Sequence, residues 1–284
     1  MQKHPMSCPV PHLYPNFLIV GVMKAATTAL SSYLNRHPNI YLPPHELHFF
    51  NRDDRYQKGS HYYQQQFTPG PDEYSVGEKT PTYSYHERAP QRIAKFNPDM
   101  RLIWIFRNPT ERAHSHYWYF VQNGQERLSF KKALALEPVR IKANIGYAYV
   151  DRGLYVTQIK RFLQYFPREN MLFLLHEDFK ADPERSIRTC IQFLDLPDMP
   201  NLTFGAVPEN VTRLPRVPAL QWLAYKYLYY RFSLGYKIIH RLNRRKQAGY
   251  PSLPEALKAQ LDHFYGPYNA QFADLTGLDV VRWQ

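Results

Sequence analysis

The sequence predicts an α/β fold in which helices flank an open parallel sheet. Four short runs are expected strands, at 16–20, 74–78, 101–106 and 171–175, and three of them are almost continuously apolar. Such runs are typical of strands that are buried on both faces. Helical patterns alternate with the runs, which favours right-handed crossovers and a ligand site at the carboxyl ends of the strands.

The helices are expected from apolar spacing and from end signals. They span 27–36, 90–96, 109–121, 153–166 and 183–194. The first stops before His37-Pro38, because a residue that precedes proline disfavours the helical conformation. The third begins with Asn108 as a candidate N-cap and Pro109 at the first helical position.

Composition limits the class of protein. The chain has 284 residues, of which 44% are hydrophobic and 21% charged, so a wholly disordered chain, a collagen-like repeat and a coiled coil are excluded. Its two cysteines, Cys8 and Cys190, are too few for a disulfide framework. The first fifteen residues contain no apolar run of signal-peptide length. We therefore expect a cytoplasmic protein.

Positive charge is concentrated near the C-terminal end. The net charge is +12, and no acidic residue occurs between Glu209 and Glu255, where nine Lys and Arg residues lie. The stretch 214–249 mixes these residues with Tyr, Leu and Trp, and we expect an extra basic helical region there. Its helices either pack on the α/β body or face an acidic glycan or an acidic membrane surface.

The first strand runs into the segment GVMKAATTAL, residues 21–30. A strand that ends in a tight loop before a helix offers free backbone N–H groups to an anion, so the fold is P-loop-like. The spacing differs from a Walker A loop, because Lys24 precedes the small residues. Ala25 and Ala26 tolerate positive φ poorly, which predicts a near-helical loop. The alternative is an ordinary turn with a surface lysine.

A second segment, FRNPTERAHSHY, covers residues 106–117. Arg107 ends a predicted strand, and Ser115 lies two turns into the following helix. A guanidinium and a hydroxyl suit a phosphate dianion. The alternative makes Arg107 an ion-pair partner near the helix end and Ser115 a packing residue.

Together, the Lys-x-x-Thr-Thr loop and the Arg-Asn-Pro-x-x-Arg-x-x-Ser segment resemble the sulfotransferases that use 3′-phosphoadenosine 5′-phosphosulfate (PAPS). The segments HELHFF (45–50) and EKTPTY (78–83) resemble acceptor-site segments of the heparan-sulfate-type and related bacterial carbohydrate branch, as do 152–183 and 264–283. The resemblance implies one sulfotransferase domain over 1–284, with a tail at 1–14 and an insertion at 214–249. It also implies transfer of a sulfuryl group from PAPS to a carbohydrate or glycolipid hydroxyl, with no metal.

The resemblance assigns the cofactor contacts. Lys24 would contact the bridging oxygen and the 5′-phosphate, while Arg107 and Ser115 would hold the 3′-phosphate. Further contacts are implied for Ala25, Ala26, Thr27 and Thr28 of the loop, and for Lys246 and Gly249 of the basic segment RRKQAGYP (244–251). A solvated basic turn is the alternative for this last segment.

The resemblance also makes Glu46 the general base and places Lys79 on the cofactor sulfate or the acceptor. If HELHFF is extended, Glu46 and His48 point to the same side, because side chains alternate along a strand. His48 is then a secondary polar contact to the acceptor. One alternative makes His48 the base, as in the branch of the family that sulfates small molecules. The other makes it a packed histidine that is hydrogen-bonded to the backbone.

Three other functions are alternatives. The basic aromatic stretch suits a nucleic-acid-binding protein, although no RRM, KH, zinc-finger or helix-turn-helix signature accompanies it. The anion-binding loop suits a phosphoryl-transfer enzyme, but no acidic Mg²⁺ partner follows a strand. A sulfotransferase that acts on a small or lipid hydroxyl is the third.

Overall fold

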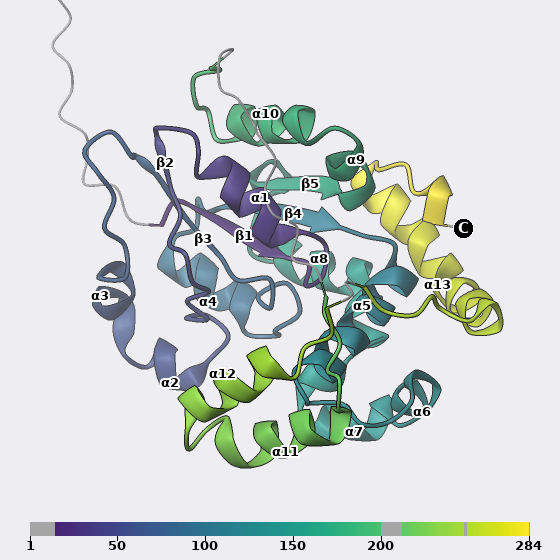
Figure 1. The fold of residues 1–284 in the computed structure, drawn as a ribbon. Helices are drawn as coiled ribbons and strands as arrows, with labels where there is room; N and C mark the ends of the chain where they lie inside the picture. The colour runs from purple at the N-terminus through teal and green to yellow at the C-terminus, as the bar shows by residue number, and fades with distance from the viewer. Residues whose placement is uncertain (1–14, 200–211, 247–248, 284) are drawn as a thin grey trace, which may run out of the picture. The chain divides into compact units, whose positions relative to one another are not determined.

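The structure is a computed structural model that describes residues 15–199, 212–246 and 249–283 (Figure 1). These residues form two compact units, which are described separately. Unit 1 contains 15–22, 26–106 and 159–199, and unit 2 contains 23–25, 107–158 and the described residues from 212 on. The expected tail at 1–14 lies outside the described residues, and a single domain over 1–284 stays a prediction.

Unit 1 is built on a parallel sheet of five strands in the order β2-β3-β1-β4-β5 (Figure 1). The strands are β1 (Phe17–Gly21), β2 (Ile40–Tyr41), β3 (Ser75–Lys79), β4 (Arg101–Phe106) and β5 (Met171–Leu175). The predicted fold class is confirmed, and the four predicted strands are β1, β3, β4 and β5 within a residue. The sequence analysis missed β2, because two residues are too few to show a periodic pattern.

The register of the central strands positions the polar end of β3. Leu18 and Ile19 of β1 pair with Glu78 and Lys79 of β3. Gly77 lies against the ring of Phe17, and a Cβ atom at Gly77 would approach that ring to 2.3 Å. A side chain larger than hydrogen would therefore separate β1 from β3 just before Glu78.

Helices cover both faces of the sheet in unit 1. They are α1 (Thr27–Leu34), α2 (Asp53–Tyr56), α3 (Gly59–Gln64), α4 (Ala89–Phe96), α8 (Tyr155–Leu163, in this unit from Ile159), α9 (His176–Ala181) and α10 (Pro183–Phe193). Figure 1 shows α10 and α4 on opposite faces of the sheet. Cys190 is a buried free thiol on α10, where the sequence predicts a helix.

Unit 2 is mainly helical. Its helices are α5 (Pro109–Gln122), α6 (Phe130–Ala135), α7 (Glu137–Ala143), the start of α8, α11 (Pro218–Leu228), α12 (Ser233–Leu242) and α13 (Glu255–Thr276). Asn108 caps α5 as predicted, because its side chain accepts hydrogen bonds from the backbone N–H groups of Thr110 and Glu111. The helices expected within 214–249 are α11 and α12. None of the helices in the described ranges is long and apolar enough to span a bilayer.

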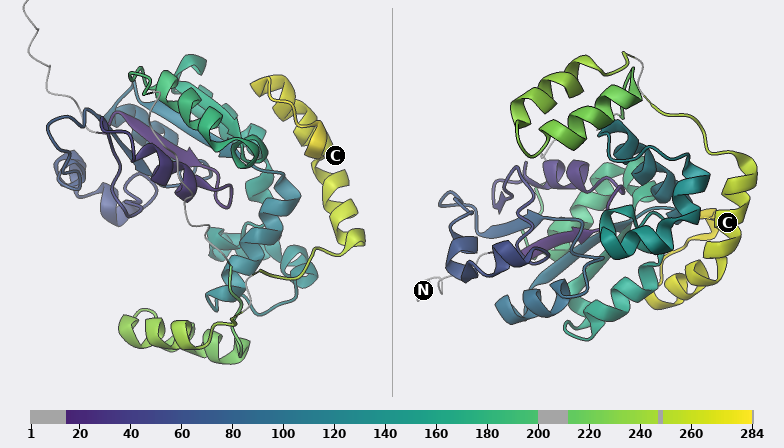
Figure 2. Two further views of the ribbon diagram at one scale, coloured as in Figure 1. Left: turned by 45° about the horizontal axis from the view of Figure 1, so that its top comes forward. Right: turned by 90° about the horizontal axis from the view of Figure 1, so that it is seen from below.

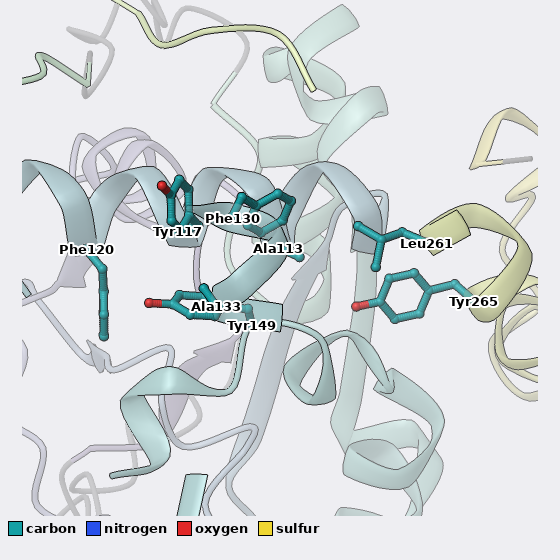
Figure 3. Close-up of a cluster of buried hydrophobic side chains, with 8 residues drawn as sticks. All are labelled: Ala113, Tyr117, Phe120, Phe130, Ala133, Tyr149, Leu261 and Tyr265. Carbon is teal, nitrogen blue, oxygen red and sulfur yellow. The ribbon is translucent and has the colours of Figure 1, made fainter. Parts of the chain in front are cut away.

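An aromatic cluster holds α5 in unit 2. Figure 3 shows its eight buried side chains, which come from α5, α6, α13 and the segment before α8. Tyr265 of α13 is fully buried and donates a 2.8 Å hydrogen bond to the carbonyl oxygen of Val150. The helix that carries Ser115 is thus fixed by aromatic packing along its length.

Candidate active site

The loop between β1 and α1 has a left-handed backbone at two non-glycine residues. The φ angles of Lys24 and Ala26 are 74° and 67°, and Ala26 is the N-cap residue of α1. The prediction of a near-helical loop is therefore wrong. Left-handed alanine is disfavoured by roughly 1–2 kcal/mol, but Ala25 between the two residues is fully buried, so packing fixes the loop. Of the two threonines that follow, Thr27 is buried and Thr28 is exposed.

Four of the predicted site residues form one polar cluster in unit 1. The ammonium nitrogen of Lys79 lies 3.2 Å from Oε1 of Glu46 and donates a 3.1 Å hydrogen bond to Oγ1 of Thr28. Nε2 of His48 lies 3.3 Å from Oε2 of Glu46. The Lys79 side chain is largely buried, while those of Glu46 and His48 are each about a third exposed. The cluster thus joins the first turn of α1 to the HELHFF segment and can be reached from solvent.

The backbone around Glu46 and His48 is turned, not extended. His48 has a φ of 50°, so the condition of an extended HELHFF segment is not met at this residue. The side chains of Glu46 and His48 meet nevertheless, because the turn brings the ring back to the carboxylate. The other ring nitrogen of His48 lies 3.3 Å from Oδ1 of Asn51.

A buried carboxylate at the end of β3 holds this turn. Oε2 of Glu78 accepts a 3.3 Å hydrogen bond from the backbone N–H of Leu47. The N–H groups of His48 and Phe49 donate to the hydroxyls of Thr80 (3.3 Å) and Tyr83 (2.8 Å). The EKTPTY segment therefore positions the HELHFF segment through its backbone, which the sequence analysis did not foresee.

Glu78 itself is completely buried and surrounded by donors. The hydroxyls of Tyr63 and Tyr83 each donate a 2.6 Å hydrogen bond to Oε1, and the hydroxyl of Thr80 donates one of 2.9 Å to Oε2. Burial raises the pKa of Glu78 above its ordinary value, and the donors oppose that rise. Removing the Glu78 carboxylate would leave the buried hydroxyl of Tyr63 without its acceptor.

Glu46 is held in its ionised form. Burial raises the pKa of its carboxyl, but the hydrogen bond and charge of His48, together with Lys79, more than offset this and bring the pKa below its ordinary value. The carboxylate can therefore accept a proton at neutral pH.

Lys24 and Arg107 meet in unit 2. The guanidinium of Arg107 donates a 3.4 Å hydrogen bond to the carbonyl oxygen of Lys24 and pairs with Glu111 at 2.9 Å. The ammonium of Lys24 lies 4.6 Å from the ring centroid of Tyr119. Buried Ser115 is four residues from both Glu111 and Tyr119, so all three share one face of α5. The hydroxyl is thus on the helix face whose neighbours contact Arg107 and Lys24.

The ammonium of Lys24 is unusually acidic. Burial lowers its pKa to about 8, with further lowering by the charges of Arg107 and Arg112. Cations crowded in this way favour the arrival of an anion, which would raise the pKa again. The donor set, an ammonium, a guanidinium and a hydroxyl, fits a phosphorylated ligand.

Arg112 and His116 are buried polar residues on α5 that the sequence analysis did not single out. Arg112 donates to the carbonyl oxygen of Tyr149, while its Nε and Nη1 atoms have no hydrogen-bond partner among the described residues. Both ring nitrogens of His116 are likewise buried without a partner there. Burial, followed by the charges of Arg112, Arg152 and Lys24, holds the pKa of His116 well below its usual range. The position of Arg112 within Arg-Asn-Pro-x-x-Arg was the available signal.

Lys246 and Gly249 lie on a loop of unit 2. Lys246 is exposed, and its carbonyl oxygen accepts a 2.5 Å hydrogen bond from Arg213. Gly249 has a φ of 99° and donates to the carbonyl oxygen of Thr212. Among the described residues, the hydrogen bonds and ion pair of Arg107 go to Lys24 and Glu111 and not to Lys246. Tyr250, which follows, packs against His114 and Trp118 of α5.

The sequence of the chain matches known proteins. The sulfotransferase domain profile matches residues 14–211. Heparan sulfate glucosamine 3-O-sulfotransferase 5 of Mus musculus is 30% identical over 275 residues, which cover 95% of this chain and 74% of that protein. Heparan sulfate glucosamine 3-O-sulfotransferase 6 of Homo sapiens is also 30% identical, with 94% and 73% covered.

A solved structure agrees with the sequence matches. The crystal structure of a sulfotransferase from Alicyclobacillus acidocaldarius has a TM-score of 0.71 and 28% identity to this chain, and covers 95% of this chain and 98% of its own. The resemblance found in the sequence is confirmed, and the nucleic-acid-binding alternative is not favoured. The chain therefore belongs to the sulfotransferase family, whose members transfer a sulfuryl group from PAPS, and is an enzyme of that class.

Proposed function

We propose that the chain sulfates a carbohydrate hydroxyl, with Glu46 as general base and Lys24 as the cation that stabilises the departing phosphosulfate oxygen. The carbohydrate acceptor is supported by the relatives named for heparan sulfate glucosamine, which match nearly the whole chain. The proposal does not extend to the same sugar position as in those relatives.

The contacts of Lys79 carry the proposal. One ammonium group bonds both Thr28, in the loop that resembles the 5′-phosphosulfate loop, and Glu46, in the segment that resembles an acceptor site. A positively charged donor between these two residues fits a reaction in which an anionic group moves toward a deprotonating hydroxyl. Lys79 itself would bind the transferred group or the acceptor.

The donor set of unit 2 fits the nucleotide. The 5′-phosphosulfate would be held by the loop residues Lys24, Ala25, Ala26, Thr27 and Thr28. The 3′-phosphate would be held by Arg107 and Ser115. Bound PAPS supplies a sulfuryl group activated by its phosphate anhydride. Arg107 would exchange its ion pair with exposed Glu111 for the phosphate, because surface pairs contribute only about 0–1 kcal/mol. Lys246 and Gly249 would belong to a loop over that phosphate.

The chemical step needs one base and one cation. Glu46 accepts the proton of the acceptor hydroxyl as the new oxygen–sulfur bond forms. Lys24 stabilises the negative charge that grows on the bridging oxygen as its bond to sulfur breaks. His48 faces oxygen atoms of Glu46 and Asn51 with its two ring nitrogens, so it is better arranged to donate hydrogen bonds than to act as the base.

The test is sulfuryl transfer from labelled PAPS to a panel of glycans, small alcohols and lipid hydroxyls. We expect transfer to glycans, loss of turnover in Lys24→Ala, and mainly weaker nucleotide binding in Arg107→Ala and Ser115→Ala. This division follows because Lys24 acts on charge that develops during reaction, while the other two hold a group that does not react. Transfer only to non-carbohydrate acceptors, or equal loss of kcat in all three variants with unchanged affinity, would refute it.

A further inference from the structure

The α11–α12 hairpin, residues 217–244, carries two stripes of exposed apolar side chains. On α11, Leu220, Leu223 and Tyr227 are exposed and recur at helical spacing. On α12, Leu234, Ile238 and Leu242 recur every four residues, and Leu242 is 72% exposed. Each helix therefore presents a continuous apolar stripe to its surroundings. Figure 2 shows the two helices side by side.

The buried side of the same hairpin holds polar side chains beside Ala224 and Tyr236. Gln221 and Asn243 are 1% and 6% exposed. The Asn243 amide exchanges two 2.9 Å hydrogen bonds with the backbone of Val217, and the Gln221 amide lies 3.0 Å from Nδ1 of His240. A surface helix in water normally buries apolar residues and exposes polar ones. The α11–α12 hairpin leaves both apolar stripes exposed, so they are available to another partner.

The polar side attaches the hairpin to α5 within unit 2. Tyr236 donates a 3.1 Å hydrogen bond to the carbonyl oxygen of Asn123. At Gly124, a Cβ atom would lie 2.4 Å from the carbonyl oxygen of Gln221, so the two backbones are in close contact. The guanidinium of Arg127 stacks on Trp222 at 4.2 Å. None of these three contacts is made by a side chain of the apolar stripes.

The tip between α11 and α12 is aromatic and basic. Tyr230 is 83% exposed and Phe232 is 59% exposed, on either side of exposed Arg231. Tyr, Phe, Lys and Arg together are the side chains favoured at the boundary between lipid headgroups and acyl chains.

The charge of the hairpin is of one sign. Lys226, Arg231, Lys237, Arg241 and Arg244 are exposed, and the hairpin has no acidic residue. Within the described chain, none of these five side chains forms an ion pair with a carboxylate. A surface that combines unneutralised cations with apolar stripes complements a negatively charged apolar layer.

We propose that the α11–α12 hairpin is a docking surface for an anionic lipid bilayer, with Tyr230 and Phe232 inserted at the headgroup level and the basic side chains on the lipid phosphates. A second copy of this chain is a poor occupant, because a two-fold contact would bring the same cations together. An acidic glycan would use the cations but leave the six aliphatic and aromatic stripe residues in water. Docking is peripheral and goes beyond the proposed sulfuryl transfer.

The test is flotation of the full chain with neutral phosphatidylcholine vesicles and with vesicles that contain phosphatidylserine. We expect binding to the acidic vesicles that weakens as salt is raised, because exposed charges are screened. The variant R231S/K237S/R241S should reduce partition by about 100-fold, since each basic residue contributes about fivefold. Y230S/F232S, which keeps every charge, should reduce it by about tenfold or more.

A matched control removes three exposed cations elsewhere in unit 2. K131S/K132S/K142S lowers the net charge equally and should bind vesicles almost as well as the unmodified chain. Circular dichroism and nucleotide affinity confirm that each variant is folded. Absence of wild-type binding to acidic vesicles at low salt would overturn the proposal, as would equal loss in the control. Undiminished vesicle binding in Y230S/F232S, with binding to heparin beads lost in the charge variant, would identify a glycan as the occupant. A dimer in solution that the stripe substitutions dissociate would identify a second copy.

Discussion

The ammonium of Lys79 lies 3.2 Å from the carboxylate of Glu46, although the two residues come from different segments of unit 1. Lys79 is the last residue of β3 and pairs with Ile19 of β1. Glu46 lies on a loop that bonds the same region of β3 through Glu78 and Thr80. The ion pair is therefore set by sheet register on one side and by backbone hydrogen bonds on the other.

Glu46→Gln is expected to lower kcat by roughly 10²–10⁴-fold, because it removes the proposed base while preserving shape. Affinity for 3′-phosphoadenosine 5′-phosphate should change less than twofold, and His48→Ala should have a much smaller effect on kcat. Since the pKa of Glu46 lies below its ordinary value, wild-type kcat should show no acidic limb near pH 6–7, where a histidine base would lose activity. Single-turnover assays and calorimetry measure these quantities. The opposite order of the two variants would assign the base to His48.

The affinity of the free enzyme for the nucleotide should fall as pH rises above about 8. Burial and the neighbouring guanidiniums lower the pKa of Lys24 to about 8, and a bound anion raises it, so the protonated enzyme binds more tightly. Above that pKa the dissociation constant should increase by up to about tenfold per pH unit. Lys24→Arg keeps its charge and should abolish this dependence. An identical pH profile in wild type and K24R would exclude Lys24 as its source.

Glu78→Gln should destabilise the protein by roughly 1–3 kcal/mol, because an amide nitrogen would face the hydroxyl donors that now bond the carboxylate. We also expect kcat to fall with little change in nucleotide affinity, since Leu47 loses its acceptor. Urea unfolding and steady-state kinetics give the two readouts. Glu87→Gln, at an exposed position nearby, is the control and should match wild type in both. Unchanged kcat in a folded E78Q protein would show that the carboxylate does not position the acceptor loop.

Ala26→Gly and Ala25→Gly should have opposite effects on stability. The left-handed conformation of Ala26 costs roughly 1–2 kcal/mol, and glycine removes this cost. The gain exceeds the loss of backbone entropy that glycine adds on folding, about 0.5–1 kcal/mol. Ala25 lies outside the left-handed region and its methyl group is fully buried, so only losses are expected there. Thermal unfolding of both variants tests this. Equal destabilisation would mean that the loop does not strain Ala26.

The sequence predicted the parts of the fold that repeat or that have end signals. Buried strands such as Arg101–Phe106 and the helix capped by Asn108 follow from apolar runs and local hydrogen bonding. The left-handed Ala26 was predicted wrongly, because alanine disfavours positive φ in isolation and only tertiary packing selects it. The turn at His48 has no signal in the local sequence. The resemblance to a family indicated which residues form the candidate site, but not the hydrogen bonds that position them. Glu78 was unforeseen, since a carboxylate that satisfies buried hydroxyls has no local pattern.

β1 lies inside the sheet of unit 1, whereas β2 lies at its edge. This strand has only two residues and pairs with β3 alone, while β1, the strand before the nucleotide loop, lies between β3 and β4. Segments at a sheet edge can be remodelled without disturbing the strands inside. The segment 42–52, which follows β2 and contains the proposed base, can thus be exchanged while the sheet and the proposed nucleotide loop are kept. Transplanting residues 42–52 from a relative should change the accepted hydroxyl while the dissociation constant for 3′-phosphoadenosine 5′-phosphate stays constant. A parallel change in both would show that this segment is not separable from the nucleotide site.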